Sequence, residues 1–169
     1  MKRYFSKFKT QGKSPAHLGV NFSVYSGIGG FIAIAVVALL SQQTDTPYLM
    51  APFGATCVLA FGVPNSPLAQ PRNIIGGHLI STLIGLACLY LLGDHWYSLA
   101  LGVGLTICLM QLTRTTHPPA GADPLVVILG AKTLGFILNP VLSGAVVITL
   151  IALLFNNLSS KRKYPIYWK

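Results

Sequence analysis

Long apolar stretches are the feature of this chain that most restricts its fold. The clearest occupies residues 22–41, and a helix of about 20 residues extends roughly 30 Å, enough to cross the apolar part of a bilayer. Three further stretches of this kind occupy residues 73–92, 97–113 and 140–155. Only 9% of the 169 residues are charged and 53% are hydrophobic, whereas a soluble domain is about a quarter charged. The sequence therefore predicts an all-α integral membrane protein.

The net charge of +9 is concentrated near the two ends of the chain. Basic segments beside apolar spans are typical of the cytoplasmic side of a membrane. We therefore expect a cytoplasmic tail at 1–20, a transmembrane domain at 21–156 and a second cytoplasmic tail at 157–169, in a bacterial inner membrane. The polar start does not resemble a signal peptide, so the first span is expected to direct insertion. The lipid bilayer is the expected surrounding, and nucleic acid is not an expected partner, because no nucleic-acid-binding motif is visible.

Two shorter apolar segments, 48–63 and 124–138, contain proline and glycine close to their starts. The sequence PFGAT at 52–56 aligns without a gap with PAGAD at 119–123. Each motif stands between a preceding long span and a following span, which indicates two repeats at about 22–92 and 97–155. Glycine, alanine and proline are common in membrane helices, so chance is the simpler alternative. The agreement in order and spacing favours a repeat.

The repeat leaves two topologies open. If both short segments cross the membrane, the chain has six crossings and the second repeat is inverted relative to the first. Arg72 and Arg114 then share the cytoplasmic side with the tails, while Asp45 and Asp94 lie outside. If both segments are re-entrant, the chain has four crossings and parallel repeats. The positions of arginine in the short loops favour six crossings.

The prolines suggest what the short segments do. Proline suits the first turn of a helix, so Pro52 and Pro119 are expected to begin two short helices. Non-helical backbone before them is tolerated at membrane depth only where it is buried in protein or lines a cavity. In an inverted repeat the two helix starts meet near the midplane, where their N–H groups and partial positive charge form an anion site. Paired interrupted helices are typical of transporter binding sites.

The predicted substrate-binding residues combine these helix starts with nearby polar side chains. A histidine within the membrane, such as His78, is a functional candidate by default, although a hydrogen bond to a neighbouring helix also explains it. Three other candidates also have structural alternatives to a binding role. Arg72 could lie at the lipid interface, Lys132 could form an ion pair, and His117 could cap a helix. Asp123 suits the first turn of a helix and receives no functional role. The predicted set is Gly54, Ala55, Thr56, Arg72, Asn73, His78, His117, Gly121, Ala122 and Lys132.

No catalytic set is visible. The chain has none of the common nucleophile, zinc-protease or nucleotide-binding motifs, and its three acids offer little for paired-carboxylate chemistry. Its three cysteines lie in apolar stretches without a CxxC pair, which indicates small core residues. The sequence therefore predicts neither an enzyme nor a bound cofactor or metal.

The stretch HPPAGADP at 117–124 resembles the signature of the HPP family of integral membrane proteins. Residues 51–82 resemble the family's other hallmark, and the resemblance covers about residues 21–156. It implies nitrite transport, which is associated with cyanobacterial and plastid members, and a family described with four spans. Many members have threonine or another small residue in place of Asp123. The family pattern falls on Pro52, Gly54, Ala55, Gln70, Pro71, Arg72, Asn73, Gly77, His78, His117, Pro118, Pro119, Gly121 and Ala122.

Together, the residues and the resemblance predict membrane transport of nitrite, a small monovalent anion, through a site formed by the two interrupted segments. The alternative is a non-transporting membrane subunit that packs against a partner complex. Glycine-rich spans suit close helix packing, so they are compatible with that alternative and with a homo-oligomer.

Overall fold

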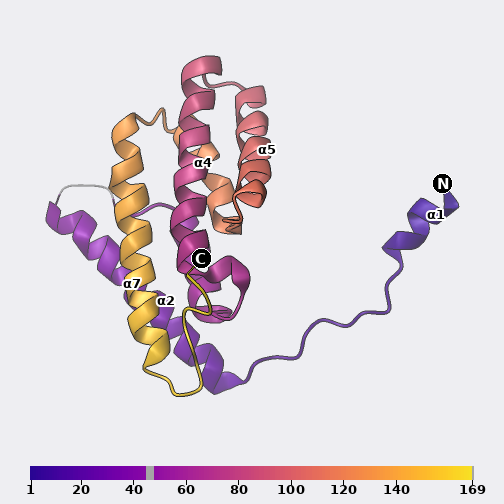
Figure 1. Ribbon diagram of the computed structural model, residues 1–169, viewed down its shortest axis with the longest axis vertical. Helices are drawn as coiled ribbons and strands as arrows, with labels where there is room; N and C mark the ends of the chain where they lie inside the picture. Colours follow the sequence, from indigo (N-terminus) through magenta and orange to yellow (C-terminus); the bar gives the residue numbers. More distant parts are fainter. Residues whose placement is uncertain (45–47, 169) are drawn as a thin grey trace.

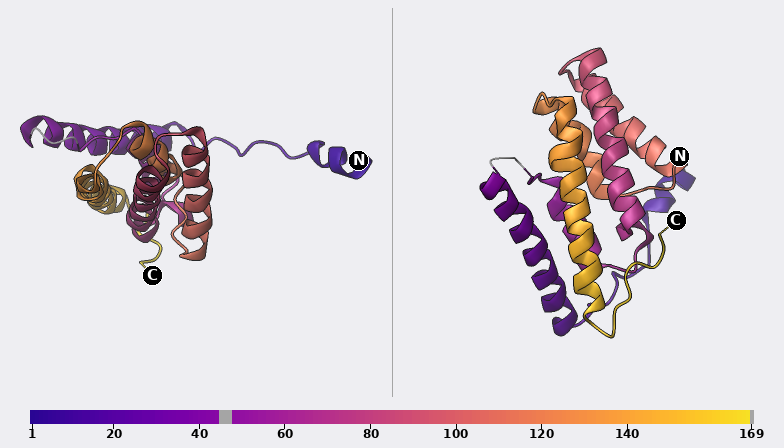
Figure 2. Two further views of the ribbon diagram at one scale, coloured as in Figure 1. Left: turned by 90° about the horizontal axis from the view of Figure 1, so that it is seen from above. Right: turned by 60° about the vertical axis from the view of Figure 1, so that its left-hand side comes forward.

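The computed structural model describes residues 1–44 and 48–168, and it is helical without a strand in this part of the chain (Figure 1). The N-terminal tail contains α1 (Lys2–Phe5) and a 3-10 turn, η1 (Ser6–Phe8), and extends away from the helical bundle (Figure 2). Asp45, which the six-crossing topology places outside the membrane, lies beyond the described residues.

Among the described residues, three helical segments are long and apolar enough to cross a membrane: α2 (Val20–Thr44), α4 (Pro71–Leu92) and the segment Leu134–Asn157. The last comprises η5 (Leu134–Ile137), η6 (Leu138–Leu142) and α7 (Ser143–Asn157). These elements confirm the helices predicted at 22–41, 73–92 and 140–155. The fourth predicted span corresponds to α5 (Trp96–Leu112), an apolar helix of 17 residues.

The two proline-containing segments form short helices with different starts. The first begins as α3 (Pro52–Cys57) and continues as η2 (Val58–Gly62), a π-helix. The second begins as η4 (Pro118–Ala122), a 3-10 helix, and continues as α6 (Asp123–Leu129). Pro52 and Pro119 lie in first turns, as predicted. Lys132 lies in the loop after α6 rather than within the apolar helix.

Both chain tails meet the same end of the bundle, which we call the tail end. Arg162, just after α7, donates to the carbonyl oxygens of Phe22 at the start of α2 and Phe61 at the end of η2. Tyr164 donates through its hydroxyl to the carbonyl oxygen of Ala69, in the 3-10 turn η3 (Pro67–Ala69) that precedes α4. The turn between α4 and α5 lies at the opposite end, with the loop that leads into α7 (Figure 1).

Small residues let the short helices pack tightly against the long ones. A Cβ at Gly144 on α7 would overlap the ring of Phe53 on α3, and Phe53 is fully buried. A Cβ at Gly77 on α4 would lie 2.8 Å from Cβ of His117, just before η4. Each glycine therefore permits a close contact that a larger residue at the same position would prevent. In both cases the short segment of one predicted repeat packs against the last span of the other.

Candidate functional site

Four fully buried side chains form a continuous series of hydrogen bonds where the short helices meet α4. His78 lies in its middle: Nδ1 is 2.7 Å from Oδ2 of Asp123, and Nε2 is 2.9 Å from Oγ1 of Thr56. The same Thr56 oxygen lies 3.0 Å from Nε2 of His117, and Nδ1 of His117 lies 2.7 Å from the carbonyl oxygen of Leu68. We call Asp123, His78, Thr56 and His117 the polar chain.

Each member of the polar chain comes from a different element. Thr56 lies one turn into α3, His78 lies on α4, His117 precedes η4, and Asp123 stands where η4 passes into α6. The rings also contact one another: the centroids of His78 and His117 are 5.1 Å apart, and that of Phe53 is 5.3 Å from His78. Packing and hydrogen bonding together hold both imidazoles in defined orientations.

The acceptors set the positions of the protons. A carbonyl oxygen only accepts, so Nδ1 of His117 carries a hydrogen and donates it to Leu68. The partners of His117 are a carbonyl and a hydroxyl, and a buried cation without an anionic partner is costly. In neutral His117, Nε2 has only a lone pair and therefore accepts from the Thr56 hydroxyl, which also lies 3.2 Å from the carbonyl oxygen of Pro52. With its one hydrogen used in this way, Thr56 accepts from Nε2–H of His78. One further proton is then shared between Nδ1 of His78 and Oδ2 of Asp123.

Some buried polar atoms beside the polar chain have no partner. The Asp123 carboxyl interacts with Thr82, one turn after His78 on α4. Neither Oγ1 of Thr82 nor Oδ1 of Asp123 completes a hydrogen bond of normal length and angle within the described residues. An unpaired buried polar atom costs about 1–3 kcal/mol. This part of the site is therefore the place where a further polar species gains most from binding.

Arg72 and Asn73 lie nearer the tail end, on the first turn of α4. Arg72 is exposed and donates from Nη2 to the carbonyl oxygen of Thr113, over 3.0 Å. Asn73 is buried, donates to the carbonyl oxygen of Thr116 and accepts from the Tyr167 hydroxyl. These bonds hold the start of α4 against the loop that carries His117.

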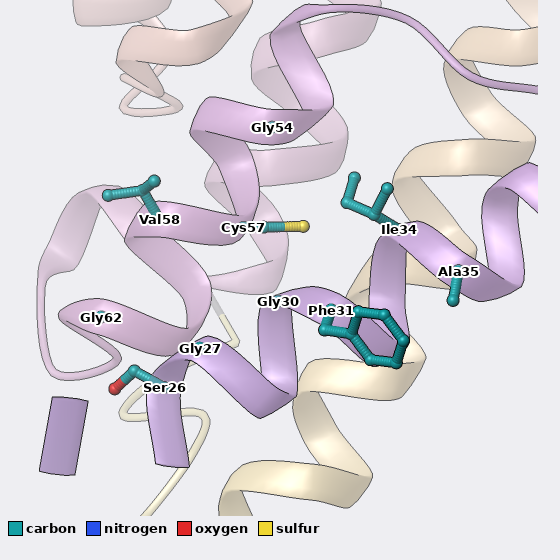
Figure 3. A pocket seen from close by; sticks show the side chains of 10 residues that line it. All are labelled: Ser26, Gly27, Gly30, Phe31, Ile34, Ala35, Gly54, Cys57, Val58 and Gly62. Carbon is teal, nitrogen blue, oxygen red and sulfur yellow. The ribbon is translucent and has the colours of Figure 1, made fainter. Parts of the chain in front are cut away.

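The other predicted residues lie on apolar surfaces or at the far end. Gly54 lines a groove between α2 and the first short helix (Figure 3), and its N–H donates to the carbonyl oxygen of Ala51. A role for that N–H in anion binding would require this bond to open. Nζ of Lys132 lies 5.5 Å from the Phe136 ring, in a hollow shared with Asn139. Of the predicted set, the polar chain brings together Thr56, His78 and His117.

A second groove, between the two short helices, has a regular lining. Five of its residues come from the first helix and five from the second, and each pair is separated by 67 positions, from Ala51 with Pro118 to Leu59 with Val126. Gly121 belongs to the same turn as Ala122, which lines this groove opposite Ala55. The register is the one that aligns PFGAT with PAGAD, so it extends over the whole wall of the groove.

Sequence reasoning missed one member of the polar chain and one residue that holds the tail end together. Asp123 was explained by its helix terminus alone, although its alignment with Thr56 was a signal that both could share a partner. Arg162 was interpreted as a basic tail residue, yet it donates to Ser26 and Asn156 as well as to two carbonyl groups. Within residues 1–44 and 48–168, no three histidine, cysteine or acidic side chains are grouped to hold a metal ion.

Comparisons with known proteins place the chain in a family of transmembrane proteins. Residues 15–165 match the transmembrane region that defines the HPP family. Two transmembrane proteins of Dictyostelium discoideum are each 38% identical to this chain, over alignments that include 98% of it. The chain spans 57% and 63% of the lengths of those two relatives. No solved structure matches it.

Proposed function

The chain belongs to the HPP family of transmembrane proteins, and on this premise we propose that it transports nitrite across the membrane where its two short helices meet. The polar chain is the observation that supports transport. It buries three titratable side chains inside a bundle of apolar helices. Such residues are costly within a membrane and typically mark the path of an ion or proton. The choice of nitrite, a small monovalent anion, follows from the family resemblance.

We further propose that the two repeats are inverted and that all six helical segments cross the bilayer. Three observations support the relation between the two repeats on which this arrangement depends. The groove between the short helices is lined by pairs of residues in one constant register. The aligned residues Thr56 and Asp123 both bind His78. Gly77 and Gly144, each near the start of a repeat's last span, contact the short segment of the other repeat.

In this proposal the path of the anion opens at the tail end, which is cytoplasmic in a bacterial inner membrane. Arg72 is exposed there, and its guanidinium has further donors beyond the one used for Thr113. We call the polar surface around Arg72 at the tail end the rim. His117 lies at the boundary between the rim and the interior, because it binds both Leu68 and Thr56. A side chain in this position is suited to control passage between the two.

Nitrite flux into liposomes that contain only this protein tests the proposal. We expect flux well above that of protein-free liposomes and a loss of flux in His117→Gln. The matched control is His95→Gln, because His95 is an exposed histidine near the start of α5. Size-exclusion profiles in detergent identify variants that fail to fold. Wild-type protein that is folded but does not move nitrite would contradict transport.

A second candidate is a membrane subunit that does not transport and packs against a partner or a second copy. The groove between α2 and the first short helix favours it, since Gly27, Gly30 and Gly54 line this groove (Figure 3). A Cβ at Gly27 or Gly54 would meet no atom within 4 Å. Open glycine surfaces permit close approach of another helix in a membrane. Absence of flux in the liposome experiment selects this function.

A further inference from the structure

We propose that the polar chain binds one exchangeable proton at its His78–Asp123 end and that this proton is transported together with the anion. The inference rests on the proposed anion transport and specifies what drives it. It depends on Asp123, to which no role was assigned from the sequence and at whose position many members of the family have a small residue.

The series of hydrogen bonds has a direction. Leu68 accepts from His117, His117 accepts from Thr56, Thr56 accepts from His78, and the shared proton lies between His78 and Asp123. Every donor in the neutral form thus faces the tail end. Chains of histidine and acidic side chains of this kind conduct protons in membrane proteins, and the imidazole ring is suited to this because it binds a proton at one nitrogen and releases it from the other.

One transfer along this series conserves every atom. The Oδ2–H bond of Asp123 breaks as Nδ1 of His78 gains the proton, and Nε2 of His78 gives its own proton to Oγ1 of Thr56. The original hydroxyl proton of Thr56 passes to Nε2 of His117. His117 then releases its Nδ1 proton at the tail end, to water or to a weakly basic anion. Asp123 is left as a carboxylate that accepts the next proton from the opposite side. His78 now carries its hydrogen on Nδ1 and His117 on Nε2, so both rings must turn back before a second proton can follow.

The unpaired atoms provide the entry point for that next proton. Oδ1 of Asp123 and Oγ1 of Thr82 are buried neighbours without a completed hydrogen bond in the described part of the chain. A water or hydronium in contact with both would satisfy them and reach the carboxyl from the side away from His117. The polar chain therefore has separate places for a proton to arrive and to leave.

The charge of the surroundings explains the coupling. The elements packed against His78 and Asp123 contribute Thr56 and Phe53 from α3, His117 from the loop before η4, and Ser81 and Thr82 from α4 itself. No lysine, arginine or second acid contacts the pair within the described residues. With the shared proton the polar chain is neutral, and without it the chain has a full negative charge. A monovalent anion is repelled by the second state and accepted by the first, so the anion passes while the proton is bound and both move toward the tail end.

Liposomes with an internal pH dye and a potential clamped by potassium and valinomycin test this coupling. We expect wild-type protein to move about one proton per nitrite after subtraction of protein-free liposomes, with a rate that does not depend on the clamped potential, because the pair has no net charge. Asp123→Asn keeps an N–H donor for His78 but has no exchangeable proton, so its proton-to-nitrite ratio should fall to background. Asp94→Asn removes an exposed acid outside the site and should retain the wild-type ratio.

Wild-type nitrite flux that follows the clamped potential and moves no protons would overturn the coupling and leave anion transport standing. Absence of nitrite flux would instead refute the transport function on which the coupling rests. If Asp123→Asn is inactive, two substitutions of Thr56 test the proton relay instead. Thr56→Val should stop proton movement, and Thr56→Ser should retain it. Proton movement that persists in folded Thr56→Val at the wild-type ratio contradicts the relay.

Discussion

The two short helical segments share a register but differ in chemistry. Both begin at proline, both line one groove in pairs separated by 67 positions, and both place the fifth residue of the aligned motif against His78. In the first segment that residue is Thr56, whose hydroxyl both donates and accepts; in the second it is Asp123, which binds or loses a proton. The comparison teaches that a shared register sets where the groups of the two segments meet, while single side chains decide what chemistry each segment contributes.

The segments also differ in how they are held. Phe53 in the first is a large buried ring, and α7 makes room for it with Gly144. The aligned residue in the second is Ala120, whose carbonyl oxygen instead accepts a hydrogen bond from Ser81 on α4. At this aligned position the first segment is held by apolar packing and the second by a hydrogen bond to α4.

The largest expected effect concerns the orientation of the two segments. Asn65 follows the first and Thr133 follows the second, and both are exposed. On a background without the three native cysteines, Asn65→Cys should react with an impermeant thiol reagent only from the cytoplasmic side, and Thr133→Cys only from outside. Labelling is measured in intact cells and in inverted vesicles. Reaction of both from one side would mean parallel repeats and four crossings.

The second largest effect is expected from removal of the Thr56 hydroxyl, which joins the two histidines. Thr56→Val keeps the shape of the side chain but leaves Nε2 of His78 and Nε2 of His117 without their partner. Each orphaned group should cost about 1–3 kcal/mol of unfolding free energy, measured by chemical unfolding in detergent. Thr56→Ser preserves the hydroxyl and serves as the control. Equal stability of the valine and serine variants would show that the polar chain is not held as described.

Glycine substitutions test whether the short segments depend on close packing against the glycines of α4 and α7. Gly77→Ala and Gly144→Ala should each destabilise the protein by about 1–3 kcal/mol, because overpacking forces neighbours to move. Gly54→Ala and Gly121→Ala are matched controls within the aligned motifs, since a Cβ at either position meets nothing within 4 Å. Thermal unfolding in detergent measures all four variants. If the controls lose as much stability as Gly77→Ala, tight packing does not explain the glycines.

The smallest expected effect concerns the rim. Arg72→Gln should raise the half-saturating nitrite concentration about tenfold, since a charge-assisted hydrogen bond contributes about 1.5 kcal/mol at an exposed position. Arg114→Gln removes an exposed arginine from the loop after α5 and is the control for net charge. Initial rates of uptake over a series of nitrite concentrations measure both variants. An unchanged half-saturating concentration in Arg72→Gln would assign Arg72 to the lipid interface instead.

The elements of the fold were predictable where a local pattern was sufficient. The spans at 22–41 and 73–92 followed from unbroken apolar sequence, and the short helices followed from Pro52 and Pro119. The site was predictable only in part. His78 and His117 were selected because histidine is unusual within a membrane, but the alternative of a bond to a neighbouring helix stayed open for His78. The structure shows such bonds and places Thr56 between the two rings.

The sequence by itself determined the class of protein, because the length of an apolar run is enough to indicate a membrane helix. It also determined where the short helices start, because proline restricts the backbone next to it. Only the tertiary structure decided that Asp123 and Thr56 meet on His78. These partners are 45 and 22 positions from His78 along the chain, and His117 is 61 positions from Thr56. Their contact depends on how α4 and the two short helices pack against one another, which no local pattern specifies. A carboxyl group that suits a helix start thus becomes one end of a buried hydrogen-bonded series.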